Sequence, residues 1–338
     1  MALEDARHQV DTAFTATDPR GMRYESTFAG VTTLFRRRFA KDLAGADVAV
    51  LGVPFDQAVT NRPGTRLGPR AIREASALQA FDPPYGWDLN PLEDLTVLDS
   101  GDLAYDYARV PDFPETLRVH VAGMLAQGPA LLALGGDHSI TFPILQAHAD
   151  RFGPVSLLQF DAHTDTWEDD DPTRLDHGTM FYKAVRLGLI DPATSVQVGI
   201  RTTNPDTMGL TVLDARWVHE NGPRATAARI RAILGDRPVY LSFDIDALDP
   251  AYAPGTGTPV WGGLTSAQAA MVLRDIAGID VIGGDVVEVS PPFDTTGATA
   301  IAAAHVAMEL LCLIAAARRA RAGAAAGQGT ARPAEQDA

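Results

Sequence analysis

Short apolar runs recur along the 338-residue chain and alternate with segments of helical character, and this alternation constrains the fold more than any other feature. Several runs are nearly continuous apolar stretches, as expected for parallel strands that are covered on both faces. The expected strands are residues 47–54, 95–100, 130–135, 155–160, 195–201, 210–218, 239–243 and 281–289. The clearest expected helices are residues 66–80, 114–126, 141–151, 225–234, 266–276 and 299–316. Because no interior linker interrupts the series, we expect one α/β domain with an eight-stranded, mostly parallel sheet and helices on both faces.

The two ends of the chain differ from this interior. Residues 1–30 lack clear periodicity and are expected to form an N-terminal arm, so the domain itself is expected to span residues 31–317. From Arg318 onwards the sequence is low in complexity, which predicts a disordered tail over residues 318–338.

Composition bears on the compartment and on the class of partner. The first residues show no basic segment followed by an apolar one, and apolar runs such as residues 129–134 are too short to span a bilayer. The lone cysteine, Cys312, rules out an internal disulfide and is expected to be a small buried apolar residue. The net charge of −15 argues against nucleic acid as a partner and is compatible with cationic substrates or divalent metals. We therefore expect a cytoplasmic protein with no nucleic-acid or membrane partner.

Polar residues collect directly after three of the predicted strands, in GGDHS (135–139), DAHTD (161–165) and SFDIDALDP (242–250). Ligands bind beyond the carboxyl ends of the strands in sheets of this kind, so these side chains are expected to meet. The candidate metal ligands are His138, Asp161, His163, Asp165, Asp244 and Asp246.

Four carboxylates in one buried site would repel one another strongly unless cations were present. We therefore expect two divalent metal ions at this site. A ligand set rich in oxygen, with some nitrogen and no sulfur, favours Mn²⁺ over Zn²⁺ or Cu²⁺, while Ni²⁺ and Co²⁺ remain open. Asp249 stands next to Pro250 and is better interpreted as a turn residue than as a ligand.

In this order and at these separations, the three motifs resemble those of the ureohydrolase (arginase/agmatinase) family. The likeness covers roughly residues 30–315, and its longer segments are most similar to bacterial agmatinases. Those segments are NRPGTRLGPRAIREAS (61–76), DHGTMFY (176–182), PGTGTPVWGGLT (254–265) and DVVEVSPPFD (285–294). The resemblance implies an eight-stranded parallel sheet, a homo-oligomer such as a trimer or hexamer, and hydrolysis of a guanidinium group, for agmatine to putrescine and urea.

The resemblance also implies roles for individual residues. The first metal would be held by His138, Asp161, Asp165 and Asp244. The second would be held by Asp161, His163, Asp244 and Asp246, so that Asp161 and Asp244 bridge the two ions. Asp165 would also accept a hydrogen bond from the attacking nucleophile, and His177 would donate a proton to the leaving amine. Glu288 would pair with the guanidinium, and Thr258 would contribute to substrate binding together with His177.

One segment departs from the family pattern. Between DAHTD and DHGT the chain carries four consecutive acidic residues, Glu168–Asp171, which are expected near the site entrance. An acidic entrance favours a substrate with a cationic tail, so agmatine fits better than arginine, whose far end also bears a carboxylate.

Other interpretations remain open to different degrees. Zinc deacetylases of the same fold use one metal and a pair of adjacent histidines, and this chain has no such pair. Nucleotide binding is disfavoured because neither GxxxxGK[ST] nor GxGxxG occurs. A metal-binding homologue without catalysis is the main non-enzyme alternative. Within the family, 4-guanidinobutyrate, 3-guanidinopropionate, a proclavaminate precursor, another substituted guanidine or arginine could replace agmatine as the substrate.

Overall fold

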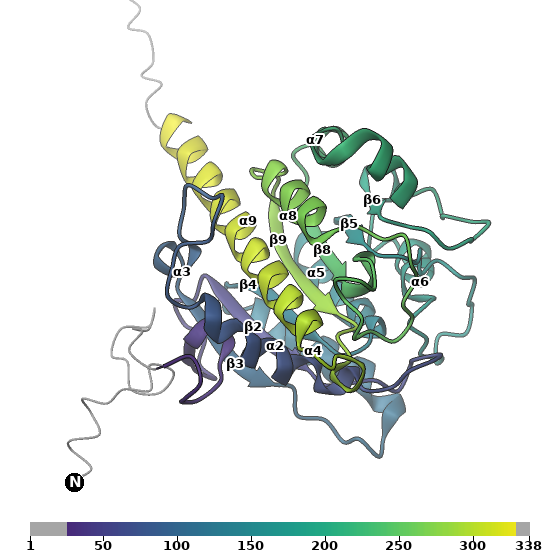
Figure 1. The fold of residues 1–338 in the computed structure, drawn as a ribbon, viewed down its shortest axis with the longest axis horizontal. Coiled ribbons are helices and arrows are strands. Elements are labelled where there is room, and N and C mark those ends of the chain that lie inside the picture. The colour runs from purple at the N-terminus through teal and green to yellow at the C-terminus, as the bar shows by residue number, and fades with distance from the viewer. Residues whose placement is uncertain (1–25, 329–338) are drawn as a thin grey trace, which may run out of the picture.

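The computed structural model describes residues 26–328, with side chains described to residue 322. Its centre is one sheet of nine parallel strands in the order β1-β3-β2-β4-β9-β8-β5-β6-β7 (Figure 1). The strands are β1 (Arg38–Phe39), β2 (Val48–Val53), β3 (Val97–Asp102), β4 (Ala130–Gly135), β5 (Ser156–Phe160), β6 (Val196–Val198), β7 (Thr211–Leu213), β8 (Val239–Asp244) and β9 (Val281–Val287). The predicted α/β fold with a parallel sheet is confirmed. The sheet has nine strands rather than eight because β1, only two residues long, adds to the edge at β3 without any apolar run to mark it.

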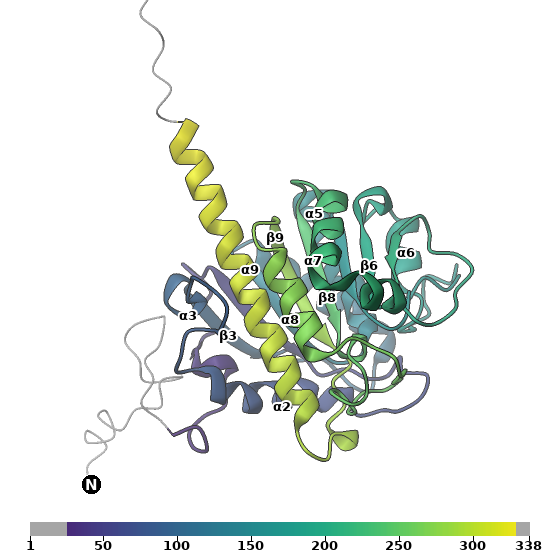
Figure 2. The same ribbon diagram turned by 45° about the horizontal axis from the view of Figure 1, so that its top comes forward.

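Helices cover both faces of this sheet, as predicted (Figures 1 and 2). They are α2 (Gly68–Ser76), α3 (Pro91–Asp94), α4 (Phe113–Leu125), α5 (Thr141–Phe152), α6 (Met180–Arg186), α7 (Ala215–Leu234), α8 (Ser266–Asp275) and α9 (Ala298–Gln328). The first face packs against α2, α3, α7, α8 and α9, and the second against α4, α5 and α6. In β2, Val48 and Val50 join the first core, whereas Ala49, Leu51 and Val53 join the second. Successive side chains of a strand point to opposite faces, so a strand buried on both sides is apolar throughout.

Helix α7 begins earlier than the sequence indicated. Residues 214–218 were expected to end a strand, but the Asp214 side chain accepts a hydrogen bond from Trp217 N (2.7 Å) and starts the helix there. The helix then continues through a kink at Gly222, whose φ is 79°, just before Pro223. This kink explains why only the second half, residues 225–234, was predicted as helical.

Helix α9 extends beyond its predicted end. It continues to Gln328, whereas a disordered tail was expected from residue 318; residues 329–338 lie outside the described part of the chain. Its alanine- and arginine-rich sequence favours a helix despite its low complexity. Three side chains also tie the helix to other elements, because Arg318, Arg319 and Arg321 pair with carboxylates before β2, in α3 and before β9. The expected N-terminal arm falls mostly on residues 1–25, which are likewise outside the described residues.

The same helix corrects the expectation that no apolar stretch is long enough to cross a membrane. Ala298–Ala322 is long enough to span a bilayer, and its most apolar window of 18 residues has a mean hydropathy of 2.0, but 78% of that window is buried inside the protein. It packs against α2, α8 and β9 (Figure 2), and Cys312 is fully buried within it, as predicted. Within the described residues, α9 thus has the burial of a core helix.

The order of the strands decides where a ligand can bind. The four central strands of the sheet are, in order, β4, β9, β8 and β5. β4 and β5 are consecutive in the sequence, but in the sheet β9 and β8 are inserted between them. Such a reversal of strand order leaves a crevice beyond the carboxyl ends of the strands. All three polar motifs follow central strands, so the fold brings them to this crevice.

Candidate metal centre and substrate cavity

The backbone turns tightly after β4 and places His138 in the crevice. A Cβ atom on Gly136 would lie 2.4 and 2.6 Å from backbone oxygens of residues 53–55, so only glycine fits there. The Asp137 carboxylate accepts a hydrogen bond from Ser139 N (3.1 Å) and caps the short helix η6 (His138–Ile140).

The ring of His138 faces three carboxylates. Its Nδ1 atom lies 3.1 Å from Asp161 Oδ2, 2.9 Å from Asp165 Oδ2 and 3.3 Å from Asp244 Oδ2. Nδ1 is fully buried and makes no well-directed hydrogen bond to any of these oxygens. One nitrogen surrounded by three convergent oxygens is the arrangement expected of atoms that share a metal ion.

The opposite edge of the His138 ring is held by a buried polar network. Nε2 lies 2.8 Å from Ser242 Oγ, and Ser242 donates to Asp285 Oδ1 (2.7 Å). Tyr240 and Thr141 donate to the other oxygen of Asp285, at 2.7 and 2.8 Å. Because Nε2 is engaged in this network, Nδ1 is the nitrogen presented to the carboxylates.

His163 forms a second convergence beside the first. Its Nδ1 atom lies 3.1 Å from Asp246 Oδ2 and 3.4 Å from Asp161 Oδ1. The other Asp246 oxygen accepts a hydrogen bond from Ala162 N (3.0 Å), which ties the end of β8 to the loop after β5. Asp161 therefore faces both histidines, with one carboxylate oxygen toward each.

The carboxylates of this cluster oppose one another's ionisation when no cation is considered. Burial, together with the charges of Asp246 and Asp161, raises the pKa of Asp244 well above its usual value. Burial and the charge of Asp161 likewise raise the pKa of Asp165 to about 6. For Asp161, His138 and His163 outweigh burial and lower the pKa, but the pKa values of the other three carboxylates stay raised. The protein alone thus compensates the negative charge only in part, so the residues fit a site built for cations.

The donor atoms divide into two groups, each with atoms close enough together to hold one metal ion. One group is His138, Asp161 and Asp244, and the other is Asp161, His163 and Asp246. Each group contains three of the four ligands that the sequence assigned to that metal. Asp161 belongs to both groups, as a bridging ligand would.

Two residues near the centre adopt a backbone conformation that side chains other than glycine seldom take. Asp165 has a φ of 52° and Glu288 a φ of 64°. Left-handed backbone at non-glycine residues costs about 1 kcal/mol or more and clusters at functional sites. In both cases the unusual φ belongs to a residue whose side chain is buried in the crevice.

His177 is joined to Glu288 across the crevice. His177 Nδ1 lies 2.9 Å from Glu288 Oε1, while Thr60 N donates to His177 Nε2 (3.1 Å). Since Nε2 accepts this bond in the neutral ring, the proton resides on Nδ1 and is donated to Glu288. Burial lowers the pKa of His177, but the hydrogen bond and charge of Glu288 outweigh burial and raise that pKa to about 9.

The two oxygens of the fully buried Glu288 carboxylate have different surroundings. Oε1 accepts a hydrogen bond from His138 N (2.8 Å) in addition to that from His177. Oε2 is buried and has no hydrogen-bond partner among the described residues. A Cβ atom on Gly257 would lie 3.3 Å from Oε2, so glycine at this position keeps the space beside that oxygen free.

A cavity of about 340 Å³ opens onto this centre. It is lined by Thr60, His163, Asp165, Trp167, Glu168, Arg174, Asp176, His177, Gly178, Thr179, Asp244 and Thr258. Thr258, which the sequence assigned to the substrate, lies at the cavity wall and also contacts the centre, because its Oγ1 donates to Asp246 Oδ2 (3.3 Å). Asp249, interpreted as a turn residue, accepts hydrogen bonds from three backbone N–H groups and belongs to neither metal group.

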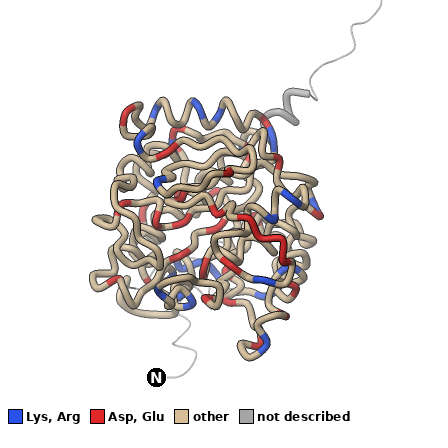
Figure 3. Tube along the Cα trace, turned by 90° about the vertical axis from the view of Figure 1, so that its right-hand side faces the viewer, with Lys and Arg blue, Asp and Glu red and all other residues tan. Residues whose placement is uncertain are grey.

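The acidic run forms part of a loop on the side of the molecule shown in Figure 3. Of its four members only Glu168 lines the cavity, whereas Asp169 is buried and residues 170–171 are exposed elsewhere on the loop. The cavity has a further acidic lining residue, Asp176, that the sequence analysis did not select.

Sequence reasoning missed the residues that support the site from behind. Ser242 and Asp285 orient His138, and Thr60 orients His177. Ser242 and Asp285 carry a usable signal, because each is a polar residue within an otherwise apolar central strand and must find a partner there. Thr60 lies in a loop and carries no comparable signal.

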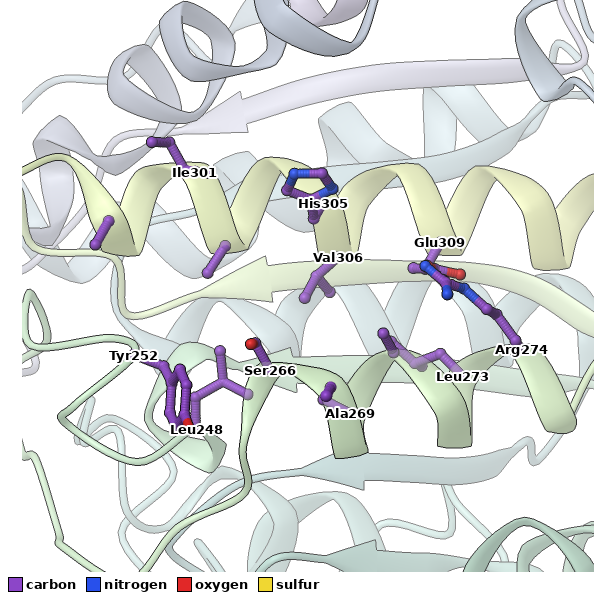
Figure 4. Close-up of a pocket in the computed structure, with 14 residues that line it drawn as sticks. Leu248, Tyr252, Ser266, Ala269, Leu273, Arg274, Ile301, His305, Val306 and Glu309 are labelled. Carbon is purple, nitrogen blue, oxygen red and sulfur yellow. Dashed lines mark hydrogen bonds and ion pairs between the residues drawn. The ribbon is translucent and has the colours of Figure 1, made fainter. Parts of the chain in front are cut away.

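A second, larger cavity of about 510 Å³ lies between α8 and α9 (Figure 4). Its walls are mostly apolar, and at one end Arg274 pairs with Glu309 (2.6 Å). None of the sequence-predicted site residues lines it. The chemistry indicated by the motifs is therefore concentrated in the smaller cavity.

Comparison with known proteins agrees with this geometry. The chain is 54% identical over 295 residues to an agmatinase of Chromobacterium violaceum, covering 87% of this chain and 92% of that protein. A crystal structure described as a hypothetical agmatinase from Burkholderia thailandensis superposes with a TM-score of 0.90 at 54% identity, covering 91% of this chain and 98% of the other. The proclavaminate amidino hydrolase of Streptomyces clavuligerus gives a TM-score of 0.80 at 39% identity, covering 87% of this chain and all of the other. The sequence pattern of the arginase family matches residues 46–313, so this chain belongs to the arginase family.

Proposed function

We propose that this protein is an agmatinase, which uses one water molecule to hydrolyse agmatine to putrescine and urea. The observation that carries the proposal is the pairing of two metal-ligand groups with a buried carboxylate oxygen, Glu288 Oε2, that has no partner among the described residues. The identity of 54% to an agmatinase over most of the chain supports agmatine as the substrate.

The metal-ligand groups would hold two divalent ions, with Asp161 common to both. Asp165, whose Oδ2 lies 2.9 Å from His138 Nδ1, would complete the first ligand group, and Asp244, a member of the first group, would be shared with the second. Two such ions supply a polarised water as nucleophile at neutral pH. The oxygen-rich donor set supports Mn²⁺, with Ni²⁺ or Co²⁺ as alternatives.

Glu288 would orient the substrate. One of its oxygens is fixed by His138 N and His177, which leaves Oε2 to accept hydrogen bonds from the guanidinium N–H groups. This pairing is charge-assisted in a buried setting and fixes the guanidinium carbon relative to the metal ligands. Asp165, held in its left-handed backbone conformation, would accept a hydrogen bond from the attacking water.

His177 would move the proton. Glu288 raises its pKa and so favours its protonation, and its ring lines the cavity between Thr60 and Glu288. When Nε2 takes up a proton it gives up the hydrogen bond from Thr60 N and can donate to the Thr60 hydroxyl, 2.8 Å away, or to the substrate. A protonated imidazole at that position can donate to the amine nitrogen as the bond to the guanidinium carbon breaks. Putrescine and urea then leave through the cavity mouth.

Three further features belong to the same proposal. The lone cysteine and the absence of a basic segment followed by an apolar one at the first residues support a cytoplasmic protein. The family resemblance supports a homo-oligomer, such as a trimer or hexamer. One domain, which extends past the expected boundary at residue 317 along α9, would carry the whole site.

The test is urea release from a panel of guanidines by the full chain loaded with Mn²⁺ and, in parallel, with Ni²⁺. The panel contains agmatine, arginine, 4-guanidinobutyrate, 3-guanidinopropionate and a proclavaminate precursor. The expected result is the highest kcat/KM for agmatine. A higher kcat/KM for another member would overturn agmatine as the substrate but leave guanidine hydrolysis as the reaction. Release of no urea from any member would overturn the assignment as an enzyme of this kind.

A further inference from the structure

The four acidic residues of the loop after DAHTD do not share one role. Asp169 forms an ion pair with Lys183 Nζ (3.0 Å), and Asp170 accepts a hydrogen bond from the Tyr182 hydroxyl (2.8 Å). Asp171 accepts a hydrogen bond from the backbone N–H two residues later (2.8 Å). Lys183 and Tyr182 lie in α6, so Asp169 and Asp170 attach the loop to that helix, while Asp171 holds the turn of the loop itself. All three carboxylates therefore have partners within the protein.

Glu168 differs from its three neighbours. It lines the cavity, its side chain is exposed, and it makes no hydrogen bond or ion pair within the part of the chain that the structure describes. Asp176 also lines the cavity, but it pairs with Arg174 (2.7 Å) and accepts from Gly178 N (2.8 Å). Apart from the metal-ligand residues, Glu168 is therefore the lining carboxylate whose charge no described partner offsets.

The residue before Glu168 attaches this part of the loop to the cavity wall that follows His177. Trp167 N donates to Gly178 O (3.1 Å), next to His177, and the indole ring lies 3.6 Å from the position of a Cβ on Gly178. The Trp167 side chain lines the cavity and is half exposed. An aromatic face beside a carboxylate is a favourable surface for an alkylammonium group, since both attract the cation.

We propose that Glu168, with the ring of Trp167, binds the ammonium group at the far end of the substrate, and that this one residue, rather than the acidic run, determines preference for a guanidine with a cationic tail. The inference rests on the proposed function, in which Glu288 fixes the guanidinium end. The four methylenes of agmatine would then extend along the cavity past His177 toward Glu168.

The expected effect follows from the exposure of Glu168. An exposed charge pair changes an equilibrium by a factor of up to about 5, and salt screens it. Glu168→Gln should therefore raise KM for agmatine by a factor of about 2 to 5 at low salt, with little change in kcat. Glu168→Asp keeps the charge and should return KM most of the way to the unmutated value.

The experiment measures putrescine formation from agmatine by the full Mn²⁺-loaded chain, with pentylguanidine as a competitive inhibitor. Pentylguanidine carries a methyl group where agmatine carries its ammonium, so its Ki should not change in Glu168→Gln. Asp170→Asn is the matched control, because it removes one negative charge two residues away and keeps an oxygen for the Tyr182 hydroxyl. Both agmatine KM and pentylguanidine Ki should be unchanged in this control.

Three outcomes would overturn the inference: an unchanged agmatine KM in Glu168→Gln, an equal rise in Asp170→Asn, or a parallel rise in pentylguanidine Ki. An equal rise in Asp170→Asn would show that the total negative charge of the loop, and not Glu168 itself, attracts the substrate. A parallel rise in pentylguanidine Ki would show that the substitution changed the shape of the cavity. If the unmutated chain formed no putrescine from agmatine, the proposed function itself would fail, which is a different result from an active enzyme that is indifferent to Glu168. Circular dichroism and metal content of each variant verify that the fold and the centre are intact.

Discussion

Acid should destabilise this protein partly through His148, a histidine of α5 that takes no part in the proposed reaction. Its side chain is fully buried, with Nδ1 2.9 Å from Ile144 O and its ring centroid 4.8 Å from that of Tyr240 in an edge-to-face arrangement. Nε2 is buried without a hydrogen-bond partner among the described residues, and a Cβ on Gly283 would lie only 2.7 Å from it. Nε2 therefore packs closely against Gly283, and a proton added there would find no acceptor among the described residues.

Burial therefore lowers the pKa of His148 to about 4 from an ordinary value of 6.5. Between these two pKa values His148 is protonated in the unfolded chain and neutral in the folded chain. The unfolding free energy therefore rises with pH across this window. The contribution is complete above pH 6.5 and is lost as the pH falls toward 4. A difference of 2.5 pH units corresponds to about 3 kcal/mol of unfolding free energy.

The assay compares the unmutated protein with His148→Leu, an apolar residue of similar size, by urea unfolding at pH 7.5, 6.5, 5.5 and 4.5. Other groups also titrate here, and the metal ligands release their ions, but both proteins share those effects. The difference in unfolding free energy between the two isolates His148, and it should shift by about 2 to 3 kcal/mol in favour of the leucine variant from pH 7.5 to 4.5. A difference that stays constant with pH would refute the buried, neutral state of this histidine.

The remaining predictions concern the metal centre. Asp161→Asn should remove metal and activity together, because Asp161 belongs to both ligand groups, as elemental analysis after dialysis would show. His177→Ala should keep both metals and slow turnover by a factor on the order of 10² to 10⁴; an empty site would mean that it is a ligand. Ser242→Ala should weaken metal affinity about 10- to 100-fold in a chelator competition, since it frees the His138 ring, and an unchanged affinity would deny that role. Chelation of metal from the unmutated protein should lower its melting temperature, and an unchanged value would contradict a centre that links three strand ends.

Much of the fold could be predicted because burial on both faces leaves a simple pattern. β8 and β9 are buried along their whole length and were predicted from their apolar residues alone. β1 could not be predicted, because two residues at a sheet edge need no apolar run. The end of α9 was mispredicted because low complexity was interpreted as disorder, whereas alanine and arginine favour a helix and the arginines find partners on distant elements.

Part of the candidate site could likewise be predicted from the sequence, and part could not. Residues that follow a central strand, such as Asp161 and Asp244, could be placed together from the sequence because parallel strands end at one edge. The acidic run could not be assigned residue by residue, since its members differ only in which partner the folded loop offers. α6 carries the partners of Asp169 and Asp170, and this short helix was not among those predicted. Four like charges in a row therefore separate, once folded, into three that hold a loop and one, Glu168, that faces the cavity. The net charge of a loop predicts whether a cationic or an anionic group on the substrate is preferred. Only the tertiary contacts show which side chain of the loop remains available to that group.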